Sequence, residues 1–144
     1  MPDERQKSAE MKIKHRMQSL DSSLCGQACI AMLLDLEIDV VVSLMGRRGG
    51  TTIKMLSQFL SANGFECDDR LTRTSKGWGK PNLCIIKLRF NGRYSGHWVL
   101  WNGETKMYHD PSSSQPIEEN IYEAWLPTTP ENARITSYLE IKKQ

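Results

Sequence analysis

The apolar residues of the chain form helical patterns in its first half. Residues 25–36 (CGQACIAMLLDL) are apolar on nearly every side, which predicts a buried helix. The polar residues that could cap its start are Asp21, Ser22 and Ser23. Residues 37–45 predict a short second helix. A third helix is expected after a cap at Thr51 or Thr52, and Gly64 is expected to end it.

After Gly64 the pattern changes to the alternation that is typical of strands. Asn91-Gly92 and Asn102-Gly103 are turn signals, and the second of them stands between two apolar runs as in a tight hairpin. Strands are expected over residues 84–90, 97–101, 106–110 and 135–141. Helices followed by antiparallel strands predict an α+β fold.

Length and charge place this pattern in one domain. The chain has 144 residues, with 19 basic and 17 acidic side chains and a net charge of +2. That length is typical of a single domain. We therefore expect a polar N-terminal arm over residues 1–17 and one domain over residues 18–144. The longest apolar run, residues 28–34, is far shorter than the roughly 20 residues of a membrane span.

The ends of the chain and its cysteines favour a cytoplasmic protein with reduced thiols. The first ten residues are polar and lack the apolar core of a signal peptide. The four cysteines also lack the CxxC spacing of common zinc sites. We expect no membrane span, although delivery elsewhere by a non-standard route stays open.

Cys25 is the candidate nucleophile because it stands where the buried helix begins. The helix dipole and the free N–H groups of the first turn favour a thiolate there. Gly26 would let the backbone approach a substrate carbonyl. The alternative is that Cys25 is a small buried apolar residue. A zinc site built on Cys25, Cys29 and a histidine is disfavoured because Cys29 lies inside the apolar run, and we expect no metal and no cofactor.

The strand pattern supplies a base for this thiol. The chain has three histidines: His15, His97 and His109. A two-residue turn at Asn102-Gly103 would place His97 and Asp110 on the same face of the hairpin, diagonal to each other, and His109 on the opposite face. A four-residue turn keeps this parity and a three-residue turn breaks it. An acidic partner would orient the imidazole of His97 and stabilise its cation.

These residues occur in an order that resembles a known family. The matching pieces are Gln18, the run CGQACIAM from Cys25, GTTI from Gly50, HWVL from His97, and Asp110-Pro111. Together they are similar to the papain-like peptidase domain of bacteriocin-exporting ABC transporters, the double-glycine leader peptidases, which also has stand-alone relatives. The resemblance covers residues 18–111.

The resemblance implies a role for each matching residue. Cys25 would be the nucleophile, His97 the base and Asp110 the residue that orients His97. Gln18 would donate to the oxyanion together with the backbone N–H of Cys25. Gln18 stands seven positions before Cys25, one more than the family pattern, so the loop between them would have to bulge. The implied fold is papain-like, with N-terminal helices packed on a C-terminal antiparallel sheet.

The function expected from this set is that of a cysteine peptidase, which cleaves a peptide or protein substrate through an acyl-enzyme. The same triad would also suit an acyltransferase or a deamidase. A further alternative is a non-catalytic module that binds a peptide or a nucleic acid. Residues 70–94 are basic with interleaved aromatic residues and no acidic ones, which suits single-stranded nucleic acid, although a solvated surface is the preferred interpretation. Residues 112–144 receive no role, and no feature indicates an oligomeric state.

Overall fold

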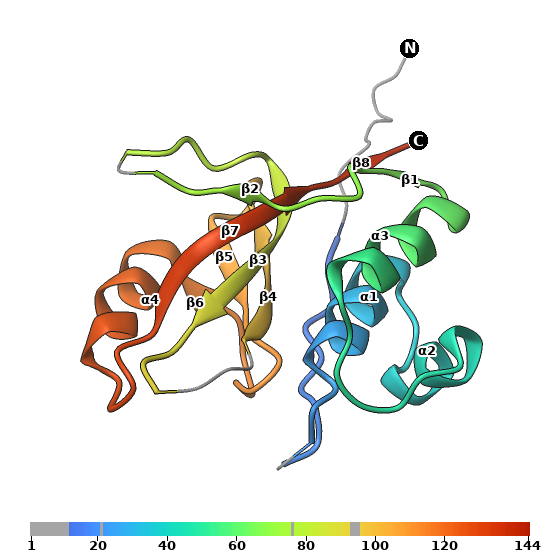
Figure 1. Cartoon of the computed structure of the whole chain (residues 1–144), viewed down its shortest axis with the longest axis horizontal. Helices are drawn as coiled ribbons and strands as arrows, with labels where there is room; N and C mark the ends of the chain where they lie inside the picture. The colour runs from blue at the N-terminus through green and yellow to red at the C-terminus, as the bar shows by residue number, and fades with distance from the viewer. Residues whose placement is uncertain (1–11, 21, 76, 93–95) are drawn as a thin grey trace.

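The computed structural model describes residues 12–20, 22–75, 77–92 and 96–144 (Figure 1). It is an α+β fold in which three helices precede every strand of the described residues. Its elements in chain order are α1 (Cys25–Leu34), α2 (Ile38–Met45), α3 (Ile53–Ala62), β1 (Phe65–Glu66), β2 (Thr72–Arg73), β3 (Leu83–Arg89), β4 (His97–Asn102), β5 (Met107–His109), β6 (Ile117–Glu118), α4 (Glu119–Trp125), the 3₁₀ turn η2 (Leu126–Thr128), β7 (Arg134–Glu140) and β8 (Lys142–Lys143).

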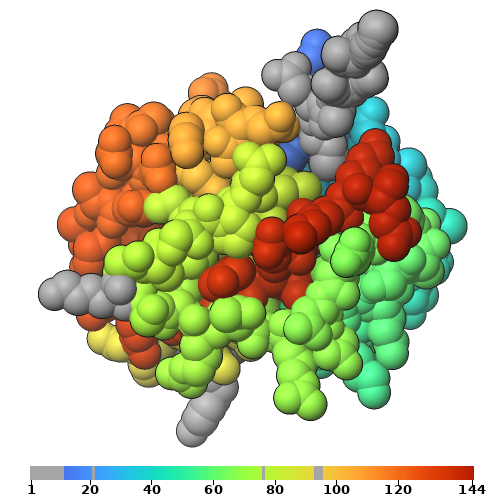
Figure 2. Space-filling view, turned by 90° about the horizontal axis from the view of Figure 1, so that it is seen from above, coloured from blue at the N-terminus to red at the C-terminus, as the bar shows by residue number. Residues whose placement is uncertain are grey.

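An antiparallel sheet of six strands forms the centre of the fold, in the order β2-β7-β3-β4-β5-β6. Helices α1, α2 and α3 lie on one side of it and α4 lies on the other (Figure 1). The short strands β1 and β8 form a separate pair. Figure 2 shows the C-terminal strands across one face of the molecule, beside the segment that carries β1 and β2.

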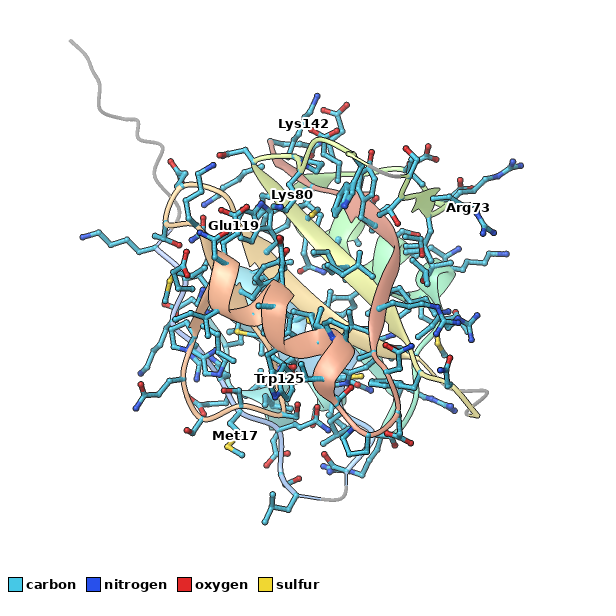
Figure 3. All side chains as sticks on the ribbon, turned by 90° about the vertical axis from the view of Figure 1, so that its left-hand side faces the viewer. Met17, Arg73, Lys80, Glu119, Trp125 and Lys142 are labelled. Carbon is cyan, nitrogen blue, oxygen red and sulfur yellow. The ribbon has the colours of Figure 1, made fainter. Side chains whose placement is uncertain are left out.

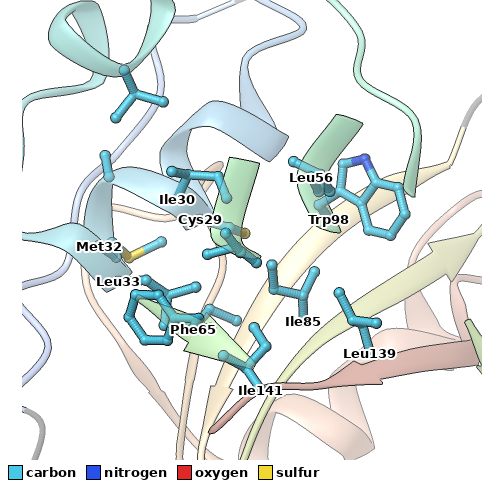
Figure 4. Packing of buried hydrophobic residues seen from close by; sticks show 14 residues of the cluster. Cys29, Ile30, Met32, Leu33, Leu56, Phe65, Ile85, Trp98, Leu139 and Ile141 are labelled. Atoms are coloured by element: carbon cyan, nitrogen blue, oxygen red, sulfur yellow. The ribbon is translucent and has the colours of Figure 1, made fainter. Parts of the chain in front are cut away.

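Both faces of the central strands are buried, so the fold has two apolar clusters. One joins α1, α2 and α3 to the sheet and includes Cys29, Ile85 and Trp98 (Figure 4). The other lies under α4 and includes Ile86 and Tyr108. The expected helices and antiparallel strands are therefore present, and the sheet lies between α1, α2 and α3 on one side and α4 on the other.

The ends of the helices differ in detail from the expectation. Helix α1 begins after Leu24, which offers no side-chain cap, so the serines before it do not cap it; Asp21 lies outside the described residues. The helix ends at Leu34 because Asp35 adopts a left-handed conformation, with φ of 55°. Thr52 caps α3 as expected, since its side chain accepts from the backbone N–H of Met55.

The hairpin between β4 and β5 has a longer turn than expected. Asn102 pairs with Met107, so residues 103–106 form a four-residue loop and the two-residue turn is wrong. Trp101 pairs with Tyr108 instead of Glu104. This shift is even, so His97 and Asp110 still share a face and His109 points to the other one.

The described part of the N-terminal arm packs onto both halves of the fold. Arg16 forms ion pairs with Asp35 at 3.2 Å and Glu37 at 2.7 Å, beside the end of α1. On the strand side, Nε2 of His15 donates to the carbonyl of Ser113 at 2.7 Å, and the backbone N–H of Gln18, the first residue after the arm, donates to the carbonyl of Pro111 at 2.8 Å. Residues of the expected arm therefore contact the domain that follows it. No helix in the described part of the chain is long and apolar enough to cross a membrane.

Candidate active site

The thiol of Cys25 lies where the start of α1 meets the start of β4. The backbone N–H of Trp98, the second residue of β4, donates to Cys25 Sγ at 3.5 Å. The N-cap residue Leu24 has no side-chain acceptor for the first-turn N–H groups. The positive end of the helix therefore faces the sulfur without a side-chain cap.

His97 lies between Cys25 and Asp110. Its Nε2 atom is 2.7 Å from Oδ1 of Asp110. That contact orients the ring, and His97 lies near enough to Cys25 for each of the two side chains to shift the pKa of the other. The structure thus brings together Cys25, His97 and Asp110, three residues that the sequence places up to 85 positions apart.

The thiol and the imidazole shift each other's pKa in opposite directions. Burial alone would raise the pKa of Cys25, but the hydrogen bond and positive charge of His97, with the N–H groups of Trp98 and Gly26, lower it overall. Burial alone would lower the pKa of His97, but Asp110 and Cys25 raise it to about 9. Both directions favour a thiolate next to an imidazolium at neutral pH.

Asp110 is held by four hydrogen-bond donors, and two of its neighbours were not predicted. Oδ1 accepts from His97, from the backbone N–H of Ser112 at 2.9 Å and from the Ser112 hydroxyl at 2.7 Å. Oδ2 accepts from the hydroxyl of Tyr122 in α4, also at 2.7 Å. Burial would raise the pKa of Asp110, but His97, Tyr122 and Ser112 together lower it to about 2. The carboxylate is therefore charged and oriented.

The other three cysteines lie in different surroundings. Cys29 is fully buried in the apolar cluster of Figure 4, and burial raises the pKa of its thiol. Burial also raises the pKa of Cys84, to about 12, and that of the half-buried Cys67. Cys25 alone of the four has a lowered pKa. Among the described residues, no group of three or more His, Cys, Asp or Glu side chains is arranged to hold a metal ion.

Gly26 has a packing role that differs from the expected one. A Cβ atom at this position would lie 2.0 Å from the hydroxyl oxygen of Thr51. The glycine therefore lets the segment before α3 close over the start of α1. The indole N–H of Trp98 donates to the carbonyl of Thr51 at 3.3 Å, and the buried Gln27 donates to the carbonyls of Arg47 and Gly49.

Gln18 lines the same surface depression as His97, but its side chain is already engaged. Its Nε2 atom donates to the carbonyl of Ser22 at 2.7 Å and is 3.1 Å from the Ser22 hydroxyl. The backbone N–H of Ser22 in turn donates to the carbonyl of Ser19, so the loop folds back on itself. This turn takes up chain length between Gln18 and Cys25. One Nε2 hydrogen is committed to Ser22, so at most the second is available to an oxyanion.

The remaining histidines and the basic stretch make separate contacts. His15 and His109 face each other through their Nδ1 atoms at 3.1 Å, away from Cys25. Lys80 forms ion pairs with Glu119 and Glu123, so the basic and acidic stretches neutralise each other at this point. Trp78 stacks on Tyr138, and the ammonium of Lys87 lies 5.2 Å from the ring of Trp98. Lys76 and Arg93 lie outside the described residues.

Two comparisons with known proteins found nothing similar, so a function is proposed from the residues of the site. A scan against models of protein families found no match. A search of curated protein sequences found no significantly similar relative.

Proposed function

We propose that the protein is a cysteine peptidase of papain-like fold. The observation that supports this most strongly is the 2.7 Å contact between His97 and Asp110 at the start of the strand whose next residue, Trp98, donates to Cys25 Sγ. The pKa of the thiol is lowered there and that of the imidazole is raised. The papain-like resemblance implies this arrangement. In it, the start of a helix carries the thiol and packs against an antiparallel sheet that carries the histidine and the aspartate.

The proposed reaction uses the three residues in sequence. The Cys25 thiolate attacks the peptide carbonyl, which forms a C–S bond and an oxyanion next to the backbone N–H of Cys25. His97 gives its proton to the peptide nitrogen, and the C–N bond breaks to leave a thioester. Water then attacks the thioester while His97 takes a proton from it, and the thiolate is released. Asp110 holds the ring and balances its positive charge throughout.

The rate at which each cysteine reacts with iodoacetamide at pH 5.5 and at pH 8.5 tests this proposal. A thiol of ordinary pKa, about 8.5, is only about 0.1% thiolate at the lower pH. We expect Cys25 to react quickly at pH 5.5 and Cys67, the other partly exposed thiol, to react slowly. His97→Ala should abolish the fast reaction. His15→Ala is the matched control and should keep it, because His15 contacts His109 and Ser113 instead.

A catalytic thiol would be contradicted if all four cysteines reacted at equal rates. It would also be contradicted if Cys25 did not react until the protein unfolded. Product masses then separate the chemistries that share the triad. Incubation with peptides should give two fragments that together contain one added water. Transfer of the acyl group to an added amine would indicate an acyltransferase, and conversion of a glutamine side chain to glutamate would indicate a deamidase.

A further inference from the structure

A surface depression lies beside His97, between the segment that leads into α1 and the end of α4. It encloses about 380 Å³, which lies within the range of about 300–1,000 Å³ for small-ligand sites. Its walls come from the segment that precedes α1, the residue after β3, the start of β4, the loop after Asp110, and the end of α4 with the residues that follow η2. Its walls include Met17, Gln18, Leu20, Phe90, His97 and Trp125.

Exposed apolar side chains form part of the wall of this depression, beside polar ones that include Glu131. Met17 is 42% exposed, Leu20 82% and Trp125 49%. Figure 3 shows Met17 and Trp125 at the same end of the molecule, opposite the end where Lys80 and Glu119 lie. Single exposed apolar residues are ordinary, but a group of them around one concave site indicates a binding surface.

The position of His97 indicates which part of the substrate would occupy the depression. In the proposed reaction the leaving amine receives its proton from His97, so the part of the substrate beyond the cleaved bond lies against this ring. Cys25 begins α1, whereas Trp125 on the wall of the depression ends α4, and these two helices lie on opposite sides of the sheet (Figure 1). The described residues of its wall include His97 and not Cys25. The depression is therefore on the leaving-group side.

We infer that this depression binds the side chain that follows the cleaved bond and selects a large apolar one, such as leucine, methionine or phenylalanine. The inference rests on the proposed peptidase function and adds its substrate class. Burial of one such side chain is expected to favour cleavage by about 10-fold to 100-fold over glycine at the same position.

Digestion of a peptide library made from a proteome, read by mass spectrometry, tests the inference. We expect leucine, methionine and phenylalanine to be enriched directly after the cut. Trp125→Ala should reduce their preference over glycine to within about threefold, and Leu20→Ser should reduce it several-fold. Ile121→Ala is the matched control because Ile121 is 64% exposed on the same helix but is not part of the wall. It should leave the preference unchanged.

Leu20→Ser is needed because Trp125 packs on Tyr122, with ring centroids 5.7 Å apart, and its removal could disturb Asp110. An unchanged Cys25 reaction at pH 5.5 shows that each variant keeps its site. Three results would overturn the inference and leave the peptidase function standing. They are cleavage without an apolar preference, cleavage with a preference for basic residues, and an apolar preference that both variants retain. Failure to cleave any peptide overturns both.

Discussion

The hydroxyl of Tyr122 is the sharpest test of how Asp110 is held. Tyr122→Phe removes this hydroxyl and keeps the ring. Oδ2 of Asp110 accepts from Tyr122 at 2.7 Å, whereas the other three donors, from His97 and Ser112, all reach Oδ1. Tyr122 is 0% exposed and Asp110 only 3%. The variant therefore leaves one oxygen of a buried carboxylate without its donor.

The expected loss follows from the charge on the acceptor. A hydrogen bond to a charged group contributes about 1.5–3 kcal/mol, against about 1 kcal/mol for a neutral pair. We expect Tyr122→Phe to lower the free energy of unfolding at pH 7 by about 2 kcal/mol, and by about 1 kcal/mol when Asp110 is already Asn. If about half of this free energy also stabilises the transition state of the reaction, the variant lowers kcat/KM by up to about tenfold, mainly through kcat.

Urea denaturation of the four proteins of this double-mutant cycle measures both values. Tyr138→Phe is the matched control, because the Tyr138 hydroxyl makes no hydrogen bond within the described residues and its ring stacks on Trp78. It should cost less than about 0.5 kcal/mol. Equal effects of Tyr122→Phe and Tyr138→Phe, or no coupling between Tyr122 and Asp110, would show that this hydrogen bond does not stabilise the carboxylate.

Three further predictions concern the same region. Gly26→Ala should lower the free energy of unfolding by about 1–3 kcal/mol because its Cβ would lie 2.0 Å from the Thr51 hydroxyl, and Thr51→Ala in the same chain should restore part of the loss in urea denaturation. The pKa of Asp110, about 2 in the fold against an ordinary 3.8, adds about 2 kcal/mol of stability above pH 3.8 that is lost as the pH falls to 2. With Cys25→Ser as the background, Asp110→Asn should therefore remove this loss from denaturation curves measured between pH 5 and pH 2. Gln18→Ala should lower kcat by about 10²–10³ if an Nε2 hydrogen turns from Ser22 to the oxyanion when substrate binds, and a fall below tenfold would restrict Gln18 to its loop contact with Ser22.

The pairing of His97 with Asp110 could be predicted because strand parity tolerates errors of register. The turn at Asn102 was expected to hold two residues, and it holds four. Residues on one face of a strand recur every second position, so a shift by an even number moves a partner along the strand without changing its face. The hairpin therefore kept His97 and Asp110 together although each predicted pair of residues was wrong.

The contacts that hold Asp110 differ in how far they could be predicted. Ser112 follows the aspartate by two positions, and a side-chain oxygen that bonds the backbone two residues later is a local pattern that the sequence does show. Tyr122 is twelve positions away on a short helix, and only the packing of α4 on the sheet brings its hydroxyl to Oδ2. Such a contact depends on tertiary structure and leaves no periodic signal in the sequence.

The contacts of the N-terminal arm also depend on tertiary structure and could not be predicted from the sequence. They link the arm to the candidate site. Its polar residues lack the period of a helix or strand, so they suggested a loose segment, yet Arg16 binds Asp35 and Glu37 on the helical half. Two residues further on, the backbone of Gln18 binds Pro111, which directly follows Asp110 on the strand half. The arm thus joins the half that carries the thiol to the half that carries the imidazole, and it continues into the loop that forms one wall of the depression. Any displacement of the arm should therefore move Gln18 and the apolar wall together, so the docking of the arm and the binding of substrate depend on the same segment.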